Sequence, residues 1–328
     1  MTRPKVLIVT PALASSNNGN WQTAWRWSRM LSGAFATRIA LEWRGEQADL
    51  LLALHARRSA DSIRTWADAN PRRPLAVVLT GTDLYRDIAT DAKAQASLQL
   101  ADRLVVLQEL GARMLAPALK RKTRVIFQST PARQTLAKSG VRLRALMVGH
   151  LRDEKSPETY FAAARILAER DDIFLDHIGA PLDASLGEAA RACMAECRNY
   201  RWLGALDYEG TRRRIQRAHV LVHASRMEGG AHVVMEAVQS GTPVIASRID
   251  GNRGMLGSGY AGCFDWGDAR KLAALLVKCR LSQNDSDGFL ARLGAQCRER
   301  AQLFEPAREK TALIDLVGDL LETTRIGR

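Results

Sequence analysis

The stretch VLVHASRMEGGAHVVMEAVQSGTPVIAS, residues 220–247, decides the fold. It begins and ends with short apolar runs of the kind that form buried parallel strands, and the segment between them has helical spacing. Gly229 and Gly230 allow the backbone to turn tightly and to approach a ligand closely. Gly241 predicts the end of the helix, and Pro243 prevents its continuation. The order strand, glycine loop, helix and strand indicates a parallel sheet covered by helices.

The loop of this stretch has the composition of an anion and sugar site. The backbone amides of Ala231, His232 and Val233 are expected to open the helix, where the first amides lack intrahelical partners and favour an anion such as a diphosphate. Glu228 precedes the loop, and Glu236 lies two turns into the helix. Carboxylates are good acceptors for the paired hydroxyls of a ribose or a hexose. Two glutamates alone are typical of a solvated surface helix, but in this order they predict a nucleotide-sugar site.

Apolar runs and helical patterns alternate on both sides of this stretch, which is typical of α/β domains with parallel sheets. The expected join is Ser129–Arg142, a polar segment rich in Ser, Thr, Lys and Arg. We therefore expect two Rossmann-like, doubly wound domains that face a cleft, with ligands bound beyond the carboxyl ends of the strands. The expected strands are Val6–Thr10, Thr37–Leu41, Leu50–Leu54, Leu75–Leu79, Leu104–Leu107, Val125–Phe127, Ala145–Val148, Phe174–Ile178, Tyr200–Leu203, Val220–His223 and Val244–Ala246. The expected helices are Trp21–Leu31, Ser59–Ala69, Pro157–Glu169, Leu186–Cys197, Tyr208–Arg217, Ala231–Ser240, Ala269–Leu281 and two within Phe289–Glu322.

The chain has 328 residues, of which 46% are hydrophobic and 25% charged, so it is long enough for two globular domains. It contains no apolar run long enough to span a membrane, and its N-terminus enters a strand-like run without a cleavage site. We therefore expect a cytoplasmic protein without an integral membrane segment. The five cysteines are irregularly spaced and are interpreted as reduced thiols. No His/Cys cluster has metal-ligand spacing, and Asp285-Ser286-Asp287 lies in a polar linker, so we expect no metal and no cofactor.

The net charge of +13 is unevenly distributed along the chain. Residues 1–140 hold 21 Lys and Arg against 10 Asp and Glu, whereas residues 141–328 hold 27 against 25. The basic first half predicts an anionic partner, and a general surplus for solubility is the alternative. Nucleic acid is not expected, because the basic residues are scattered and no nucleic-acid motif accompanies them. The glycine motifs of dinucleotide oxidoreductases and of P-loop enzymes are both absent.

The spacing Glu228-x7-Glu236, followed by AVQSGTPVIAS, resembles the EX7E region of the family 4 nucleotide-sugar glycosyltransferases, which have the GT-B fold. The resemblance implies that Glu236 holds the ribose hydroxyls of the nucleotide. It also implies that Glu228 and the backbone of Gly229–His232 hold the donor sugar and the phosphates. The implied domains are an acceptor-side domain over 1–135, a donor-binding domain over 136–300 and a C-terminal helix, about 301–328, that crosses back to the first domain.

A second segment, ALMVGHLRDEKSPETYFAAARIL (145–167), carries the same resemblance. The family has a Gly-Arg-Leu turn followed by a Lys five residues after the Arg, and both cations hold the diphosphate. Here Lys155 keeps its place, but His150 stands at the Arg position, which removes a permanent bidentate cation. Either Arg152 supplies the missing charge or the pocket works with one cation fewer. An ordinary turn histidine is an equal alternative for His150.

The first half resembles the acceptor domain of the same family. PALASSNNGNWQTAWRWSRML (11–31) resembles its flexible glycine loop and helix, with Gly19 as the hinge and Asn20 next to it as a substrate-binding residue. QADLLLALHARRS (47–59) ends a strand at His55, where the family has a histidine near the reacting carbon. The residues to which the resemblance gives catalytic roles are His55, Lys155 and Glu228.

Three segments, NNGNWQTAWRWSRML, LHARRSADSI and LTGTDLYRDI, more closely resemble the short glycosyltransferases that make selenosugars in selenoneine biosynthesis. That resemblance implies UDP-N-acetylglucosamine as the donor, selenophosphate as the acceptor and a carbon–selenium bond at the anomeric carbon. Selenophosphate is already anionic, so the enzyme has to attract, orient and desolvate it rather than remove a proton. The basic side chains near strand ends that would suit this acceptor are His55, Arg57, Arg58 and Arg86.

Other functions stay open at this point. A family 4 glycosyltransferase with a small oxygen acceptor, such as a phosphorylated sugar or an inositol, would use the same charges. A non-catalytic nucleotide-sugar or RNA-binding protein could share the fold, although Lys155, Glu228 and Glu236 argue against it. A sugar 2-epimerase would form its product without any acceptor. The sequence makes no prediction of the oligomeric state.

Overall fold

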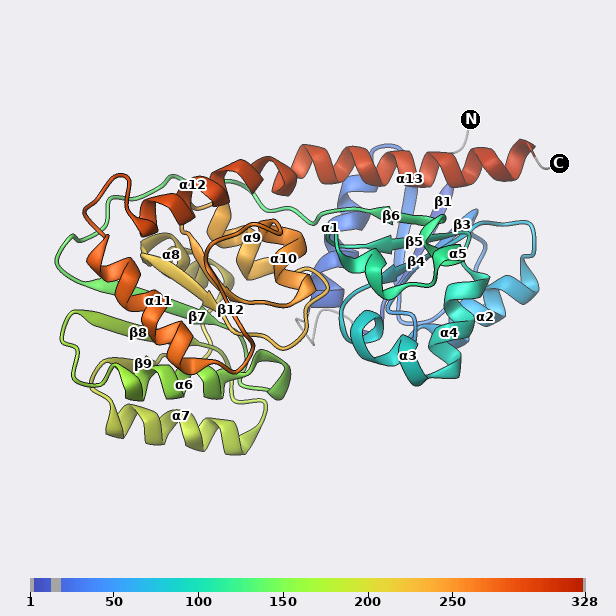
Figure 1. Cartoon of the computed structure of the whole chain (residues 1–328). Helices are drawn as coiled ribbons and strands as arrows, with labels where there is room; N and C mark the ends of the chain where they lie inside the picture. Colours follow the sequence, from blue (N-terminus) through green and yellow to red (C-terminus); the bar gives the residue numbers. More distant parts are fainter. Residues whose placement is uncertain (1–2, 13–18, 327–328) are drawn as a thin grey trace. The chain divides into compact units, whose positions relative to one another are not determined.

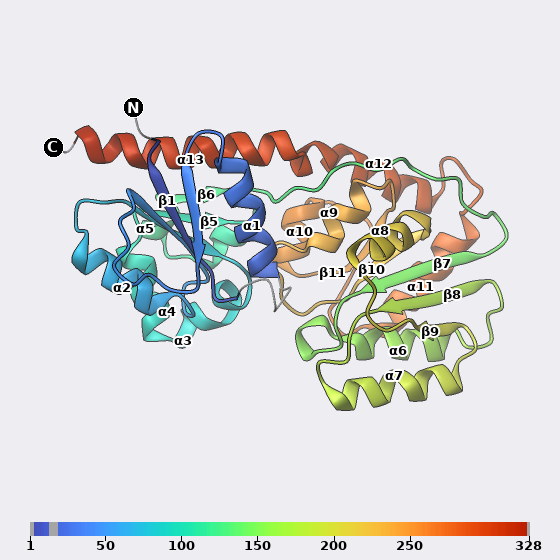
Figure 2. The same cartoon turned by 180° about the vertical axis from the view of Figure 1, so that it is seen from behind.

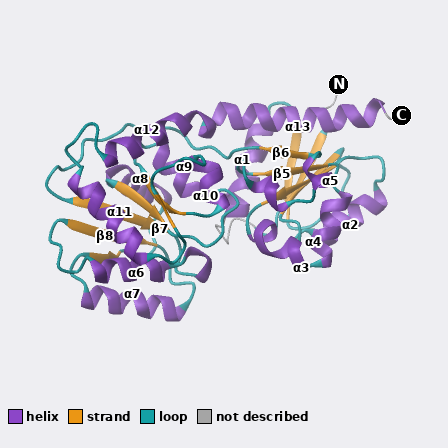
Figure 3. Ribbon diagram, in the orientation of Figure 1, coloured by secondary structure: helices purple, strands orange, loops and turns teal. Residues whose placement is uncertain are grey.

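The computed structural model describes residues 3–12 and 19–326, and the chain divides into two compact units. Each unit is built on a six-stranded parallel sheet with helices on both faces (Figure 1, Figure 3). The predicted α/β class with two doubly wound sheets is therefore confirmed. Unit 1 consists of Met1–Ser129, Glu228–Gly230 and Pro306–Arg328, and unit 2 consists of Thr130–Met227 and Ala231–Glu305.

The sheet of unit 1 has the strand order β2-β1-β3-β4-β5-β6, with all neighbours parallel. Strands β3 and β4 are buried at every position because they are continuous apolar runs, LLLAL and LAVVL, in the middle of the sheet. The strands are β1 (Lys5–Val9), β2 (Ala36–Ala40), β3 (Leu50–Leu54), β4 (Leu75–Leu79), β5 (Arg103–Val106) and β6 (Thr123–Val125).

Unit 1 has one hydrophobic core on each face of its sheet. The first core contains Trp27 from α1 and Val317 from α13, and the second contains Trp66 from α2 and Leu98 from α4. Figure 2 shows α1 and α13 on one side of the strands and α2 and α4 on the other. The helices are α1 (Gly19–Leu31), α2 (Ala60–Ala69), α3 (Ile88–Thr90), α4 (Ala92–Leu100), α5 (Pro117–Lys120) and α13 (Pro306–Ile326).

The sheet of unit 2 has the strand order β12-β11-β10-β7-β8-β9. Helix α6 packs against α7 and α11, whereas α9 packs against α8, α10 and α12. The strands are β7 (Leu143–Val148), β8 (Ile173–Ile178), β9 (Tyr200–Trp202), β10 (Val220–His223), β11 (Val244–Ser247) and β12 (Cys263–Phe264). The helices are α6 (Pro157–Ile166), α7 (Ala184–Glu196), α8 (Tyr208–Arg217), α9 (His232–Val238), α10 (Asp250–Leu256), α11 (Ala269–Leu281) and α12 (Phe289–Ala301).

The deciding stretch folds as predicted, with small differences at the helix. Helix α9 lies between β10 and β11 but is shorter than the predicted Ala231–Ser240. Gly241 has φ 67°, a left-handed conformation that favours glycine after a helix. Asp285 and Asp287 lie in an exposed turn, in which the Asp287 amide donates to Oδ1 of Asp285 at 2.9 Å.

Candidate functional site

The turn after β7 carries His150, Arg152 and Lys155, and a short 3₁₀ turn over Asp153–Lys155 precedes α6. The stem of Lys155 packs against Gly149 at the end of β7. A Cβ atom added to Gly149 would lie 3.3 Å from both Cγ and Cδ of Lys155. Glycine at this position therefore lets the lysine lie across the end of the strand.

Two residues that follow other strands hold this turn. Arg226, after β10, donates from its backbone N to Glu154 O at 2.9 Å and from Nη2 to Asp153 Oδ2 at 2.6 Å. Trp266, after β12, donates from Nε1 to Ser156 Oγ at 2.8 Å. Ser156 has φ 48°, an unusual conformation for a residue other than glycine that persists where its surroundings fix it. Sequence reasoning missed Arg226 and Trp266, because partners so far apart in the chain leave no local signal.

The structure specifies the hydrogen-bonding role of His150. Its Nδ1 accepts a hydrogen bond from the Ala180 amide at 3.1 Å, so the proton of the neutral ring lies on Nε2. Burial, followed by the positive charges of Arg152 and Lys155, lowers the pKa of His150. His150 is therefore an uncharged donor at neutral pH, and the permanent positive charges of the turn belong to Arg152 and Lys155.

The glycine loop differs in one respect from its prediction. Helix α9 begins at His232, and Ala231 is its N-cap residue. The Ala231 amide, which was expected to face an anion, instead donates to Met255 Sδ at 3.1 Å, a weak acceptor. The amides of His232 and Val233 stay candidates for anion binding. Of the predicted loop residues, Glu228, Gly229 and Gly230 group with unit 1, and Ala231, His232 and Glu236 belong to unit 2.

Glu236 is a largely buried carboxylate beside a cation. Only 8% of the residue is exposed, and its Oε1 lies 4.0 Å from Nη1 of Arg212 on α8. A carboxylate in this setting suits a pair of hydroxyl donors, since charge-assisted hydrogen bonds are the stronger ones.

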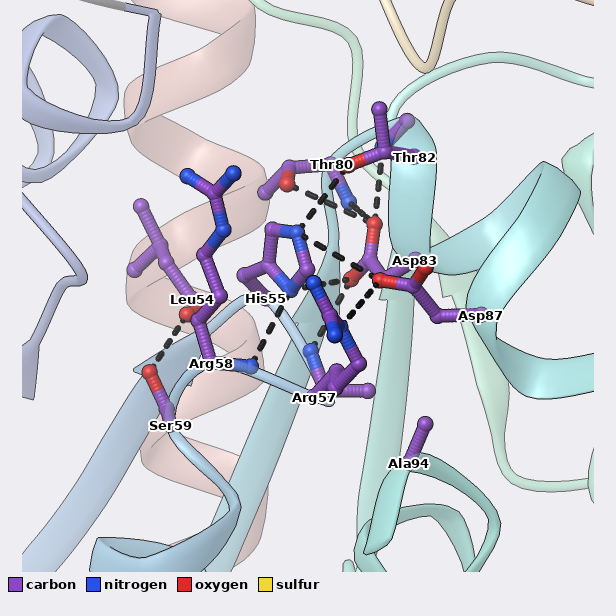
Figure 4. Close-up of polar contacts among 12 residues, drawn as sticks. Leu54, His55, Arg57, Arg58, Ser59, Thr80, Thr82, Asp83, Asp87 and Ala94 are labelled. Carbon is purple, nitrogen blue, oxygen red and sulfur yellow. Dashed lines mark hydrogen bonds and ion pairs between the residues drawn. The ribbon is translucent and has the colours of Figure 1, made fainter. Parts of the chain in front are cut away.

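His55 directly follows β3, with φ 73° and 2% exposure. Figure 4 shows its ring between the turn after β3 and the segment after β4. Nε2 lies 3.1 Å from Thr82 Oγ1, and Nδ1 lies 3.3 Å from the Arg58 amide. Because the amide is a donor, Nδ1 is the acceptor and the proton of the neutral ring lies on Nε2. His55 thus donates to the Thr82 hydroxyl.

Two carboxylates fix the same region. Asp83 is fully buried, and its Oδ1 accepts from the amides of Thr80 and Gly81 while its Oδ2 accepts from the Ala56 amide, each at 2.9 Å. Asp83 and the residues up to Asp87 form a π-helical turn. Asp83 therefore joins the chain after β3 to the chain after β4. The local sequence pattern does not indicate this role of Asp83, because its partner Ala56 lies 27 residues away.

Asp87 forms ion pairs with basic side chains at the surface. Its carboxylate lies 3.0 Å from Nε of Arg57 and 3.1 Å from Nε of Arg86, whose side chains are 41% and 47% exposed. Nδ1 of His55 is 3.9 Å from Asp83, and Nε2 is 3.9 Å from Asp87. Burial nevertheless lowers the pKa of His55, because these carboxylates offset the loss of hydration only in part. The site thus combines a neutral histidine with exposed arginines.

The remaining predicted residues, Gly19 and Asn20, are the first residues of α1. The Gly19 carbonyl accepts from Thr23 Oγ1 at 2.7 Å. The glycine loop for which Gly19 is the predicted hinge lies mainly outside the described residues, so the hinge stays a prediction. None of the helices within residues 3–12 and 19–326 has both the length and the apolar composition that a transmembrane segment requires. In the same part of the chain, no group of three or more His, Cys, Asp or Glu side chains is placed to hold a metal ion.

Residues 129–287 match the protein family described as "Glycosyl transferases group 1". This segment includes the turn after β7 and the whole of β10, the glycine loop and α9. No protein with a curated description matches the chain significantly.

Solved structures of glycosyltransferases share the fold. Sucrose-phosphate synthase from Thermosynechococcus elongatus superimposes with a TM-score of 0.76 at 17% identity, covering 98% of this chain and 100% of its own. HepE from Anabaena, solved in complex with UDP-glucose, gives 0.73 at 13% identity, covering 97% and 100%. TarM from S. aureus, solved with UDP, gives 0.64 at 12% identity over 83% of this chain, which spans only 55% of TarM.

Proposed function

We propose that this chain, whose residues 129–287 match the glycosyl transferases group 1 family and whose fold is GT-B, transfers a hexosyl group from a UDP-sugar to selenophosphate. The proposed donor is UDP-N-acetylglucosamine, and the product carries a carbon–selenium bond at the anomeric carbon. We assign the donor residues mainly to unit 2 and the acceptor residues to unit 1.

The turn that holds Lys155 across the end of β7 is the observation that carries the donor assignment. Ligands of parallel sheets bind beyond the carboxyl ends of the strands, and this turn provides two permanent cations there for a diphosphate. The buried carboxylate of Glu236 suits the ribose hydroxyls, and Glu228 with the glycine loop is assigned to the donor sugar. HepE was solved with UDP-glucose and with UDP, which supports a uridine nucleotide as donor.

The acceptor assignment is supported by the cluster around Asp87. Arg57 and Arg86 carry partly exposed positive charge in the turns that follow β3 and β4, where an anion is favoured. His55 donates from Nε2 to Thr82, and its lone pair on Nδ1 accepts from the Arg58 amide, which supports a role as an orienting donor more than as a base. An acceptor that arrives as an anion needs orientation and charge more than proton removal.

Apart from the donor and the acceptor, the reaction requires only water. A selenium lone pair attacks the anomeric carbon, the bond from that carbon to the diphosphate oxygen breaks, and its electron pair leaves with UDP. Lys155 and Arg152 stabilise the negative charge that grows on the leaving group. Hydrolysis of the selenium–phosphorus bond by one water then gives the selenosugar and phosphate.

Incubation of the protein with UDP-N-acetylglucosamine and selenophosphate tests the proposal. We expect UDP release and a sugar product with the isotope pattern of selenium in mass spectrometry. Thiophosphate is the control, because it has the same charge but a less nucleophilic atom and should react more slowly or not at all. Release of UDP only with an alcohol or an inositol phosphate would instead identify an oxygen acceptor. Salt-sensitive retention on RNA without UDP release would point to a binding protein.

Variants of His55 separate orientation from base catalysis. His55→Gln keeps a donor for Thr82 and should retain more activity than His55→Ala. Equal damage from both substitutions would indicate that His55 removes a proton, since neither replacement is able to do so.

A further inference from the structure

Arg212, on α8, is one of the most buried charged side chains of unit 2, with 1% exposure. Its Nη1 donates to Thr130 Oγ1 and to Tyr208 Oη, the latter at 3.1 Å, and its Nη2 donates to the Pro131 carbonyl at 3.1 Å. Its Nε has no hydrogen-bond acceptor in the part of the chain that the structure describes. The guanidinium thus donates these hydrogen bonds to neutral partners.

A buried arginine stays charged and therefore needs a nearby anion. Glu236 provides one, with Oε1 at 4.0 Å from Nη1 of Arg212. This separation is too long for a hydrogen bond. Arg212 therefore stabilises the charge of the carboxylate through space, without a hydrogen bond of its own to the carboxylate oxygens.

We propose that Arg212 is a positioning residue for the donor site: its positive charge keeps Glu236 ionised for the ribose hydroxyls, and its own hydrogen bonds to Thr130 and Pro131 hold that charge in place. The proposal rests on the proposed function, in which Glu236 holds the nucleotide. Because Thr130 is the first residue of unit 2 after the chain leaves unit 1, the same arginine contacts both the linker and the nucleotide-binding helix. Arg212 is too deeply buried to contact the nucleotide itself.

The deciding experiment measures the affinity for UDP by calorimetry in a double-mutant cycle of Arg212→Met and Glu236→Gln. We expect Arg212→Met alone to weaken UDP binding about tenfold, which corresponds to the loss of about one charge-assisted interaction. In the Glu236→Gln background the same substitution should change the affinity less than about twofold, because coupled residues are not additive. Arg213→Met is the matched control, since Arg213 is adjacent on α8 with a side chain 68% exposed, and should leave the affinity unchanged.

Two further measurements exclude a purely structural role. Arg212→Lys keeps the charge and should recover part of the affinity. Arg212→Met should bind UDP more tightly as the pH rises, because a buried carboxylate without a cation favours its neutral form.

If Arg212→Met is not folded, Thr130→Val removes only the hydrogen bond that holds Arg212 and should still weaken UDP binding. The positioning role would be overturned if the two substitutions change the free energy of UDP binding additively. It would also be overturned if Arg212→Met binds UDP as the wild type does. If Glu236→Gln alone leaves UDP affinity unchanged, the donor assignment itself fails.

Discussion

At the scale of single residues, His177 on β8 contacts Gly149, at the start of the turn that carries Lys155. Its Nε2 is 3.3 Å from the Gly149 carbonyl, and its Nδ1 is 3.0 Å from the Tyr200 hydroxyl. Burial lowers the pKa of His177 from 6.5 to about 4. The neutral ring donates to Gly149 and accepts from Tyr200, whereas a protonated ring is unable to accept. Protonation of His177 thus acts on Gly149, from which the turn that carries Lys155 begins.

The stability of the protein should therefore fall in mild acid. The unfolded chain binds a proton at this site near pH 6.5 and the folded chain only near pH 4, so the stabilisation is complete above pH 6.5 and is lost as the pH falls toward 4. Protonation of this residue should lower the free energy of unfolding by about 3 kcal/mol. Urea unfolding between pH 7 and 4 should give a smaller slope of the free energy of unfolding with pH for His177→Phe. A slope equal to that of the wild type would contradict the assignment.

Lys155 should act on the reaction more than on binding. Charge on UDP grows as the glycosidic bond breaks, so Lys155→Ala should lower kcat about 100-fold while the affinity for UDP changes less. Lys93→Ala, which removes an exposed lysine paired with Asp61, is the matched control. Steady-state kinetics and calorimetry measure the two quantities separately. An unchanged kcat with a raised KM would give Lys155 a role in binding only.

Sequence reasoning found His55 and Lys155 after the ends of predicted strands and Glu236 two turns into a predicted helix, because each follows a recognisable apolar run or keeps a fixed spacing. It did not find Arg212 or Asp83. Their roles come from partners that are 82 and 27 residues away in the chain, and from burial that arginine and aspartate rarely have.

At the scale of elements, Glu309 in the first turn of α13 joins three parts of unit 1. Its carboxylate accepts from Trp27 Nε1 at 2.6 Å and from the Ser129 amide at 2.8 Å, and it pairs with Arg26 Nε at 3.0 Å. The side chain is fully buried, and an acidic residue is favoured at a helix N-terminus. Glu309 thus connects α13, α1 and the last residue before the linker.

Glu309→Ala should destabilise unit 1 by about 3–5 kcal/mol, as expected when one partner of a buried ion pair is removed. Glu309→Gln should cost less, because its amide oxygen is still able to accept from Trp27. Urea unfolding followed by tryptophan fluorescence measures both changes, and Glu305→Ala at an exposed position is the control. A Glu309→Ala variant as stable as the control would show that helix packing alone holds α13.

Helices and strands were predictable from the sequence where a local pattern of apolar residues indicates their burial. Strands β3 and β4 were predicted to the residue, since both are continuous apolar runs with polar or glycine-containing flanks. Strand β12 was missed because it has only two residues, and α10 because its sequence DGNRGML contains poor helix formers. Helix α10 is held by its surroundings: its Asn252 is fully buried and donates to the Ser247 carbonyl at 3.0 Å.

At the scale of the whole molecule, the chain leaves unit 1 after Ser129, contributes Glu228–Gly230 to it, and returns to it with the last helix at Pro306. The last helix, α13, then supplies part of the core on one face of the unit 1 sheet, although it lies far along the chain from the strands it covers. Its core side chains are Leu313, Leu316, Val317 and Leu320, all 5% exposed or less. The folding of unit 1 therefore depends on the completion of the chain through unit 2.

A chain that ends at Glu305 should consequently keep unit 2 folded and lose unit 1. Burial of four such side chains contributes about 6–12 kcal/mol, which is comparable to the entire stability of a domain. Hydrogen exchange measured by mass spectrometry should show rapid exchange in β3 and β4, while β7 and β8 stay protected. A chain that ends at Glu322 is the matched control, because it keeps all four core side chains of α13 and should retain protection in both sheets. Protection of β3 and β4 in the shorter chain would mean that unit 1 folds without α13, and the two cores of its sheet would then contribute unequally to its stability.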